Sequence, residues 1–387
     1  MRKAVVAAIF CCAATAAIAV AVSFNYGAVR TTTEPSFTSA ARCLPSDAAC
    51  TRSSIEQDAG EGRFASAIQT LLLAESKNGC HTWGHLVGKH AAGRLTADEA
   101  FSLNSAELDV ACDFGYLHGV FQGLVASGAD IQRVLSLGCP VERDQWWVHE
   151  CFHGVGHAFG SSGISLDRAL LECRAIRREE SACASGVYME FAARYLEQDS
   201  ELGMNPDSLS SAEKLTDAAA REMCFTSPKA AAPDLLDTCA RKAALFWGPT
   251  TGREPLGLRC MALLRTWSGV ATSGTAVECG AGIGEWLRNS VKWEVPGSPT
   301  EAASLNELVA ASCTQETGSQ PVEYADDLLY GCVEGAVLAT LPGQIGAGIE
   351  QDSWLNPCEI PTLLPVRGRC LELIERVARQ AADSVAS

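Results

Sequence analysis

The sequence contains no Cys-x-x-Cys pair, although 18 of its 387 residues are cysteines. Without such pairs, zinc-knuckle and thioredoxin-like proteins are poor matches, and the absence of Cys-x-x-Cys-His argues against a c-type haem. Basic residues are also few, with 30 Lys and Arg against 46 Asp and Glu, which gives a formal net charge of −16. Because a surface that binds the nucleic-acid backbone must be basic, this charge argues against nucleic acid as a partner.

Strand patterns and the common catalytic signatures are absent as well. Alternating β-branched and aromatic runs do not occur, and Ala, Leu, Glu and Arg dominate the periodic segments, so we expect an all-α fold. The glycine-rich stretches 154–157 and 280–284 follow no predicted strand, which removes the context of a nucleotide-binding loop. The Gly-x-Ser-x-Gly elbow of serine hydrolases does not occur. The sequence therefore indicates a fold class and leaves the reaction class open.

The N-terminus has the pattern of an export signal. Arg2 and Lys3 precede an uncharged apolar run, Ala4–Val22, whose length is close to the ~20 residues that span a bilayer. We expect residues 1–23 to be a signal-anchor or a signal peptide, and we favour the uncleaved anchor because the candidate cleavage sites lie inside or at the edge of the run. Only Arg30 follows the run closely, so the charge bias places the body outside the cytoplasm, anchored to the membrane through this segment or secreted.

Behind this segment we expect a stalk and one large helical body. Residues 24–53 are polar and contain Cys43 and Cys50, which predicts a stalk that ends in a small disulfide loop. Residues 54–382 are long enough to bury a substantial core and form the predicted helical-repeat domain. Two cysteines lie in the apolar run, and the other 16 would meet an oxidising environment, where disulfides are the default.

The cysteines of the body follow a regular pattern. Five times a cysteine is followed three residues later by a glycine at the start of an apolar helical stretch: Cys112–Gly115, Cys151–Gly154, Cys183–Gly186, Cys279–Gly282 and Cys332–Gly335. Between these stretches, other cysteines end amphipathic runs, which predicts helices of two alternating kinds. Pairing consecutive cysteines would give the bridges 139–151, 173–183, 224–239, 260–279, 313–332 and 358–370. The alternative is to pair each cysteine of a glycine-led stretch with the next cysteine that ends an amphipathic run, because sequence does not fix connectivity.

A repeating unit of two helices, roughly 30 to 50 residues long, is typical of repeat architectures. We therefore predict disulfide-braced tandem helical hairpins in an α-solenoid or an α/α toroid-like arrangement. A glycine in such a helix lets a neighbouring helix approach closely because it has no Cβ. We expect this role for Gly186, Gly282 and Gly335.

All seven histidines fall between residues 81 and 157, in a histidine-rich region at 80–160. His118 and His157 lie six residues after a cysteine of the repeat, and His85 lies five residues after Cys80. Six residues after their cysteines, the later repeats carry Met189, Glu285 and Leu338. Architecture alone would not confine histidines to the first units, so we interpret the cluster as a site.

Spacing within the cluster indicates metal ligands. Histidines four residues apart share one face of a helix, as two ligands of one metal ion must. The predicted ligands are His81, His85, His118, His153 and His157. His90 and His149 are expected to be structural, because the first lies near the end of its run and the second precedes its cysteine. Asp113, Glu150 and Glu190 are available as further ligands, as partners of the histidines or as general bases.

Residues 149–153 match the His-Glu-x-x-His motif of zinc proteases, in which the glutamate is the general base. Glu150 is therefore the candidate catalytic residue. A disulfide at Cys151, in the middle of the motif, would be awkward, so this is the minor interpretation. Imidazole ligands favour a transition metal, zinc or copper first and iron after them, over calcium or magnesium.

Two hypotheses follow for the function. The first is an extracytoplasmic metal-binding protein, which an open coordination position would make a metalloenzyme. The second is a non-catalytic helical-repeat module that serves as a scaffold or binds a partner, with structural histidines. In both cases the sequence does not identify the small-molecule or protein ligand.

Overall fold

The computed structural model describes residues 43, 47–73, 77–139, 145–195, 217–225, 233–247, 255–266, 271–291, 299–317, 324–346 and 349–386. Throughout these ranges the regular structure is helical, which confirms the all-α prediction. The chain divides into two units, and the second, residues 38–387, contains every described helix. The predicted anchor, residues 1–23, and most of the predicted stalk lie outside the described residues. Among the helices that are described, none is long and apolar enough to cross a membrane.

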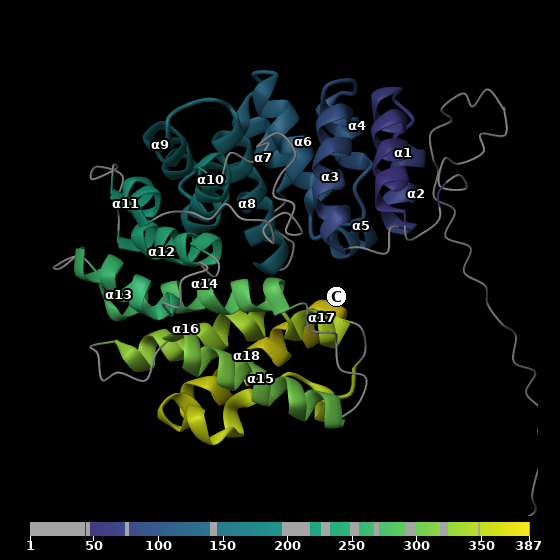
Figure 1. Cartoon of the computed structure of the whole chain (residues 1–387). Coiled ribbons are helices and arrows are strands. Elements are labelled where there is room, and N and C mark those ends of the chain that lie inside the picture. The colour runs from purple at the N-terminus through teal and green to yellow at the C-terminus, as the bar shows by residue number, and fades with distance from the viewer. Residues whose placement is uncertain are drawn as a thin grey trace, which may run out of the picture. The chain divides into compact units, whose positions relative to one another are not determined.

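One set of helices forms a row in which each member packs against the next (Figure 1). In chain order these are α3 (Lys77–Ala92), α6 (Gly115–Ala126), α8 (Gln145–Ser161), α10 (Glu180–Tyr195), α12 (Pro233–Trp247), α14 (Ser273–Val291), α16 (Ala325–Leu338) and α18 (Arg367–Ala386). The predicted glycine-led stretches all belong to this row. The histidine-rich region covers its first three helices, so neighbours in the row can bring their side chains together.

A second set of elements contains or directly precedes the other cysteine of each pair. They are α7 (Ile131–Gly138), α9 (Leu166–Ile176), α11 (Asp217–Phe225), α13 (Leu256–Thr266), α15 (Pro299–Thr317) and the 3₁₀ turn η5 (Pro357–Glu359). The remaining elements are α1 (Ala48–Gly60), α2 (Phe64–Leu73), α4 (Ala97–Ser102), α5 (Ala106–Ala111), α17 (Leu341–Gly346), η4 (Gln351–Ser353) and η6 (Pro361–Val366). Side-chain oxygens cap several of these helices; for example, Asp130 and Ser165 each accept a backbone N–H at the start of α7 and α9.

The disulfides join consecutive cysteines. The structure contains the six bridges that consecutive pairing predicts, namely 139–151, 173–183, 224–239, 260–279, 313–332 and 358–370, and not those of the alternative pairing. Each of these six closes a short loop, between 10 and 19 residues in sequence separation. In the loop-entropy model a bridge of this kind stabilises the fold by about 3 kcal/mol. Cys43 and Cys50 form the predicted small loop, although α1 already begins at Ala48.

One further bridge, Cys80–Cys112, departs from the hairpin pattern. Cys80 lies in α3, and Cys112 caps the end of α5 just before α6 begins. The bridge therefore ties the row helix α3 to the turn that leads into the next row helix, α6, whereas the later bridges tie a row helix to an element that precedes it in the chain. Its position matters for the site because Cys80 directly precedes His81.

Close helix packing explains the repeated glycines. A Cβ at Gly186 would collide with the carbonyl oxygen of His153, and one at Gly335 would collide with that of Ala281. At Gly282 the collision would be with the carbonyl oxygen of Arg241. These contacts confirm that the three glycines allow neighbouring helices of the row to approach backbone to backbone.

Candidate metal centre

Three neighbouring helices bring five histidines together. α3 supplies His81 and His85, α6 supplies His118, and α8 supplies His153 and His157. His81 is partly exposed, and the other four are buried. These are the five residues that the sequence analysis predicts as ligands, so helix packing gathers all of them in one cluster.

His118 lies in the middle of this cluster. Its ring centroid lies 5.6 Å from that of His81 and 5.5 Å from that of His85. On its other side it lies 5.4 Å from His153 and 5.3 Å from His157. The two rings of each outer pair are 4.8 Å apart on α3 and 4.7 Å apart on α8. The cluster therefore consists of two compact triads that share His118, and a contact of 5.3 Å between His85 and His157 links them.

Hydrogen bonds fix which nitrogen of His81 carries its proton. The Nδ1 atom lies 2.8 Å from the carbonyl oxygen of Asp113 and 3.2 Å from that of Cys112. Carbonyl oxygens only accept, so Nδ1–H must donate and Nε2 keeps a lone pair. Asp113 and Phe114 have positive φ angles of 46° and 60°, and this tight turn before α6 presents the Asp113 carbonyl to the ring. Such backbone conformations cost about 1–3 kcal/mol each and are typical of functional sites.

The tautomer of His85 is fixed in the same way. Its Nδ1 lies 2.8 Å from Oε1 of Gln122, whose Nε2 donates to a carboxylate oxygen of Glu190 at 3.1 Å. Because a carboxylate only accepts, Gln122 must direct its amide nitrogen to Glu190 and its oxygen to His85. The Nδ1–H group of His85 therefore donates, and its Nε2 also keeps a lone pair.

The Nε2 atoms of His81 and His85 face each other at 3.1 Å. With both protons on Nδ1, this contact contains no hydrogen and brings two lone pairs together. Two nitrogens bound to one tetrahedral zinc ion at about 2.0–2.1 Å lie about 3.3 Å apart. The separation is thus close to that of a two-histidine chelate.

Burial disfavours the protonation of His85, which would place a hydrogen in this contact. Burial, with the neighbouring His81, His157 and His118, lowers the pKa of His85 well below its usual range. Burial and the nearby histidines also lower the pKa of His118. His85 and His118 therefore stay neutral near pH 7, as metal coordination by imidazole requires.

His118 completes a three-histidine group. Its Nε2 lies 3.1 Å from the carbonyl oxygen of Glu150 and donates to it, so Nδ1 keeps the lone pair. That Nδ1 is buried and has no hydrogen-bond partner. One ring nitrogen from each of His81, His85 and His118 lies within 4.8 Å of the other two, so this group could hold a metal ion.

The pair on α8 resembles the pair on α3. The Nε2 atoms of His153 and His157 lie 3.1 Å apart, and Nδ1 of His157 lies 2.7 Å from Oε1 of Glu190. Burial, with nearby charges, lowers the pKa of His157 to about 3 and holds that of His153 well below its usual range. Glu190 and Gln122 thus connect the second pair to the first through one chain of hydrogen bonds.

A repeated motif places both pairs. The sequences are His81-x-x-Gly84-His85-x-x-Gly88 on α3, His153-x-x-Gly156-His157-x-x-Gly160 on α8 and Val277-x-x-Gly280-Ala281-x-x-Gly284 on α14. In each copy, a glycine of the following row helix packs against the carbonyl of the first residue: Gly115 on His81, Gly186 on His153 and Gly331 on Val277. The third copy keeps the glycines and the packing without either histidine. Helix packing therefore does not require the histidines.

The remaining candidates of the sequence analysis lie around the cluster. His90 lies in the last turn of α3, and no ring contact in the described part of the chain joins it to the five histidines. Burial, with Lys242 and Arg241, lowers the pKa of His149 to about 4, so this side chain lies toward α12. Burial and the nearby Asp113 raise the pKa of the Glu150 carboxyl well above its usual range, and its peptide carbonyl orients His118.

Gln122 is the residue of the site that the sequence did not indicate. It follows His118 by one helical turn, and that spacing is the signal that could have placed it on the same face of α6. Glu190, which the sequence offered as a ligand or as a partner of the histidines, hydrogen-bonds His157 and Gln122.

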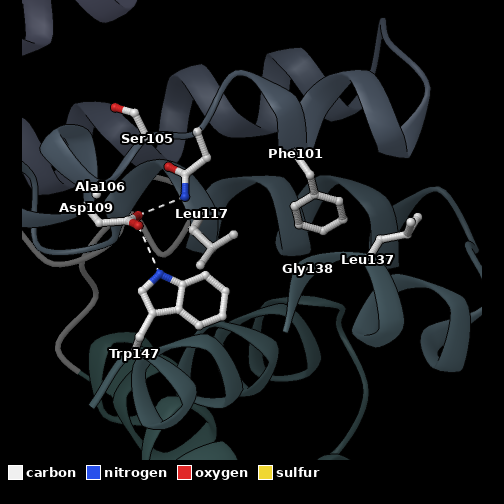
Figure 2. Close-up of a pocket in the computed structure, with 9 residues that line it drawn as sticks. Phe101, Ser105, Ala106, Asp109, Leu117, Leu137, Gly138 and Trp147 are labelled. Carbon is white, nitrogen blue, oxygen red and sulfur yellow. Dashed lines mark hydrogen bonds between the residues drawn. The ribbon is translucent and has the colours of Figure 1, made fainter. Parts of the chain in front are cut away.

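A pocket of about 150 Å³ lies apart from the histidines, between α4–α5 and α7–α8 (Figure 2). Its lining residues are Phe101, Asn104, Ser105, Ala106, Asp109, Leu117, Leu137, Gly138 and Trp147. Asp109 accepts hydrogen bonds from Nδ2 of Asn104 at 2.9 Å and from Nε1 of Trp147 at 3.0 Å. The Asp109 carboxylate thus has a structural role, because it connects Asn104 to Trp147 through hydrogen bonds.

Comparison with known proteins leaves the histidine cluster as the guide to function. No family model, no curated protein and no solved structure matches this chain.

Proposed function

We propose that this chain is an extracytoplasmic protein that binds a transition-metal ion through His81, His85 and His118. The observation that carries the proposal is the 3.1 Å contact between two Nε2 lone pairs, with a ring nitrogen of His118 within 4.8 Å of the ligand atoms of His81 and His85. A cation bound at this contact would satisfy both Nε2 lone pairs at once. Buried polar atoms are otherwise almost always paired, so an arrangement of this kind requires an explanation.

Three imidazoles suit zinc or copper, and iron less closely, whereas calcium and magnesium prefer oxygen ligands. Three protein ligands leave a coordination position for water or a substrate, which is the pattern of catalytic rather than structural zinc sites. Glu150 is our candidate for the acid–base residue, because its peptide carbonyl contacts His118 and burial raises the pKa of its carboxyl well above the usual range. The substrate would be a small molecule or a protein, and the net charge of −16 argues against nucleic acid.

The compartment follows from the cysteines. The eight disulfides join all the described cysteines, and such bridges persist in an oxidising, extracytoplasmic environment. We further propose that residues 1–23 anchor the chain to the membrane or direct its secretion, and that the hairpins continue as a solenoid or toroid-like array. The apolar run behind Arg2 and Lys3 supports the first of these, and the row of successive helices supports the second.

The rival function is a helical-repeat scaffold with structural histidines. The third copy of the motif disfavours it, because Val277 and Ala281 serve the same packing as the histidine pairs. Valine and alanine would also avoid the cost of burying imidazoles.

Metal analysis separates the two functions. The oxidised chain, purified without a histidine tag and measured by inductively coupled plasma mass spectrometry, should contain zinc, copper or iron in stoichiometric amount. His90→Ala should retain this metal, whereas the double variant H81V/H85A should lose the ion of the first triad. Failure to bind any of the three metals after reconstitution, with a melting temperature that chelator does not change, would rule out the metal-binding function.

A further inference from the structure

We infer that the histidine cluster is a two-metal centre, in which His153 and His157 chelate a second ion beside His118 and Glu190 strengthens the binding of this ion. The inference rests on the proposed function and adds a site to it. It starts from the motif on α8, which repeats that of α3 residue for residue at the histidine and glycine positions.

The second pair has the geometry of the first. In both pairs the Nε2 atoms are 3.1 Å apart, and the ring centroids are 4.8 and 4.7 Å apart. His118 is as close to the second pair, at 5.4 and 5.3 Å, as it is to the first, at 5.6 and 5.5 Å. The two pairs therefore share the close approach of Nε2 atoms that suits a two-histidine chelate, while the Nδ1 lone pair of His118 belongs to the first site.

The Nε2 atom of His157 carries the lone pair that a metal ligand needs. Glu190 accepts the Nδ1 proton of His157, so the lone pair of that ring lies on Nε2, which faces His153. His153 and Glu190 are both buried, at 8% and 2% exposure, so bulk water has little access to compete for this nitrogen. Two histidines, with open positions for water or a substrate, then make a second site.

The partners of the two pairs differ in charge. His85 donates to the neutral amide of Gln122, whereas His157 donates to the carboxylate of Glu190. A carboxylate behind a metal-bound histidine raises the basicity of that ligand and strengthens metal binding more than an amide does. Glu190 also places a negative charge beside the cation. The ion at His153 and His157 should therefore depend on Glu190 for its affinity.

The third copy of the motif supplies the test variants. H81V/H85A and H153V/H157A each convert one pair into the residues that α14 carries at the equivalent positions, where the packing is the same. Both variants should therefore fold, which far-ultraviolet circular dichroism checks. His90→Ala, on the same helix as the first pair, is the control.

The experiment is a zinc titration of the chelator-stripped chain, followed by native mass spectrometry. Wild-type protein and His90→Ala should each bind two Zn²⁺ ions, and each double variant should bind one. E190Q should bind two ions, with the affinity for the ion that H81V/H85A retains weakened about tenfold or more. Unchanged affinities in E190Q would overturn the role of Glu190.

One Zn²⁺ ion in wild-type protein and one in H153V/H157A would overturn the second site and leave the proposed function intact. No ion in any of these proteins would overturn both. Electron paramagnetic resonance after loading with Cu²⁺ provides an independent measurement. Two neighbouring ions give a spin-coupled signal in wild-type protein, and each double variant should give the signal of an isolated ion.

Discussion

The Nε2 atoms of His81 and His85 lie 3.1 Å apart, and both carry lone pairs because each ring donates its Nδ1 proton to an oxygen atom. Lone pairs at this distance repel each other unless a cation binds both. Burial opposes protonation of His85, so a metal ion is the cation that the contact favours. Without a metal ion, this repulsion between two side chains of α3 destabilises the folded state.

Removing His81 and His85 should reduce the stabilisation of the folded state by zinc. Each ion bound at a hundredfold excess over its Kd stabilises the folded state by about 2.7 kcal/mol. We therefore expect H81V/H85A to lose about that much of the zinc-dependent stabilisation, as measured by thermal unfolding with zinc and with chelator. A double variant that responds to zinc as fully as wild-type protein would show that the ion binds elsewhere.

Gln122 should matter for metal affinity although it is not a ligand. Gln122→Leu removes the acceptor that holds the Nδ1 proton of His85, so the ring loses its fixed tautomer and orientation. Loss of such a partner weakens metal binding by about 10- to 100-fold. A zinc titration of H153V/H157A with and without Gln122→Leu isolates the first site, and equal affinities in the two would contradict the positioning role.

The stability of the metal-free protein should fall as the pH drops below about 6.5, the value for an exposed histidine. The pKa values of His85, His118 and His157 are lowered in the folded state, so below that pH the unfolded chain binds protons that the folded chain does not. Each such histidine reduces the free energy of unfolding by up to about 1.4 kcal/mol per pH unit. Glu150, with a raised pKa, contributes with the opposite sign.

Urea unfolding at about pH 7 and about pH 5 measures this dependence, and H81V/H85A is the comparison that leaves Glu150 in place. The variant should lose less stability between the two pH values than wild-type protein does. Equal losses would mean that the buried histidines do not titrate as the structure indicates.

Gly186 should tolerate no side chain. A Cβ there collides with the carbonyl oxygen of His153, so Gly186→Ala must separate α10 from α8 at the second histidine pair. We expect a loss of about 1–3 kcal/mol in the free energy of unfolding. Gly60→Ala is the matched control, because a Cβ at Gly60 meets nothing within 4 Å and alanine favours the helix by up to about 1 kcal/mol. Equal effects of the two changes would refute the close packing.

Sequence patterns predicted much of this fold because its rules are local. The cysteines of each hairpin are consecutive and closely spaced, so the short-loop pairing was the simplest one, and the structure contains it. The helical period and the absence of strand patterns sufficed for the all-α class. The pairing of Cys80 with Cys112 was not predicted, since it joins α3 to the turn before α6 and has no counterpart in the later repeats.

A full prediction of the site requires the register between neighbouring helices, which the sequence does not give. Counting from the cysteines grouped His85, His118 and His157, and these rings do meet. Packing, however, makes His81 equivalent to His153, because glycines rather than cysteines set the contact between helices. Gln122 was missed for the same reason: an amide on a helix gives no signal until the residue opposite it is known.

X-ray absorption spectroscopy of the zinc-loaded chain tests the metal site most directly. We predict a first shell of imidazole nitrogens at about 2.0–2.1 Å, with the multiple scattering of histidine rings, and a weaker imidazole contribution in H81V/H85A. A shell of oxygen alone, a sulfur shell near about 2.3 Å, or a spectrum unchanged in H81V/H85A would contradict metal binding by these histidines.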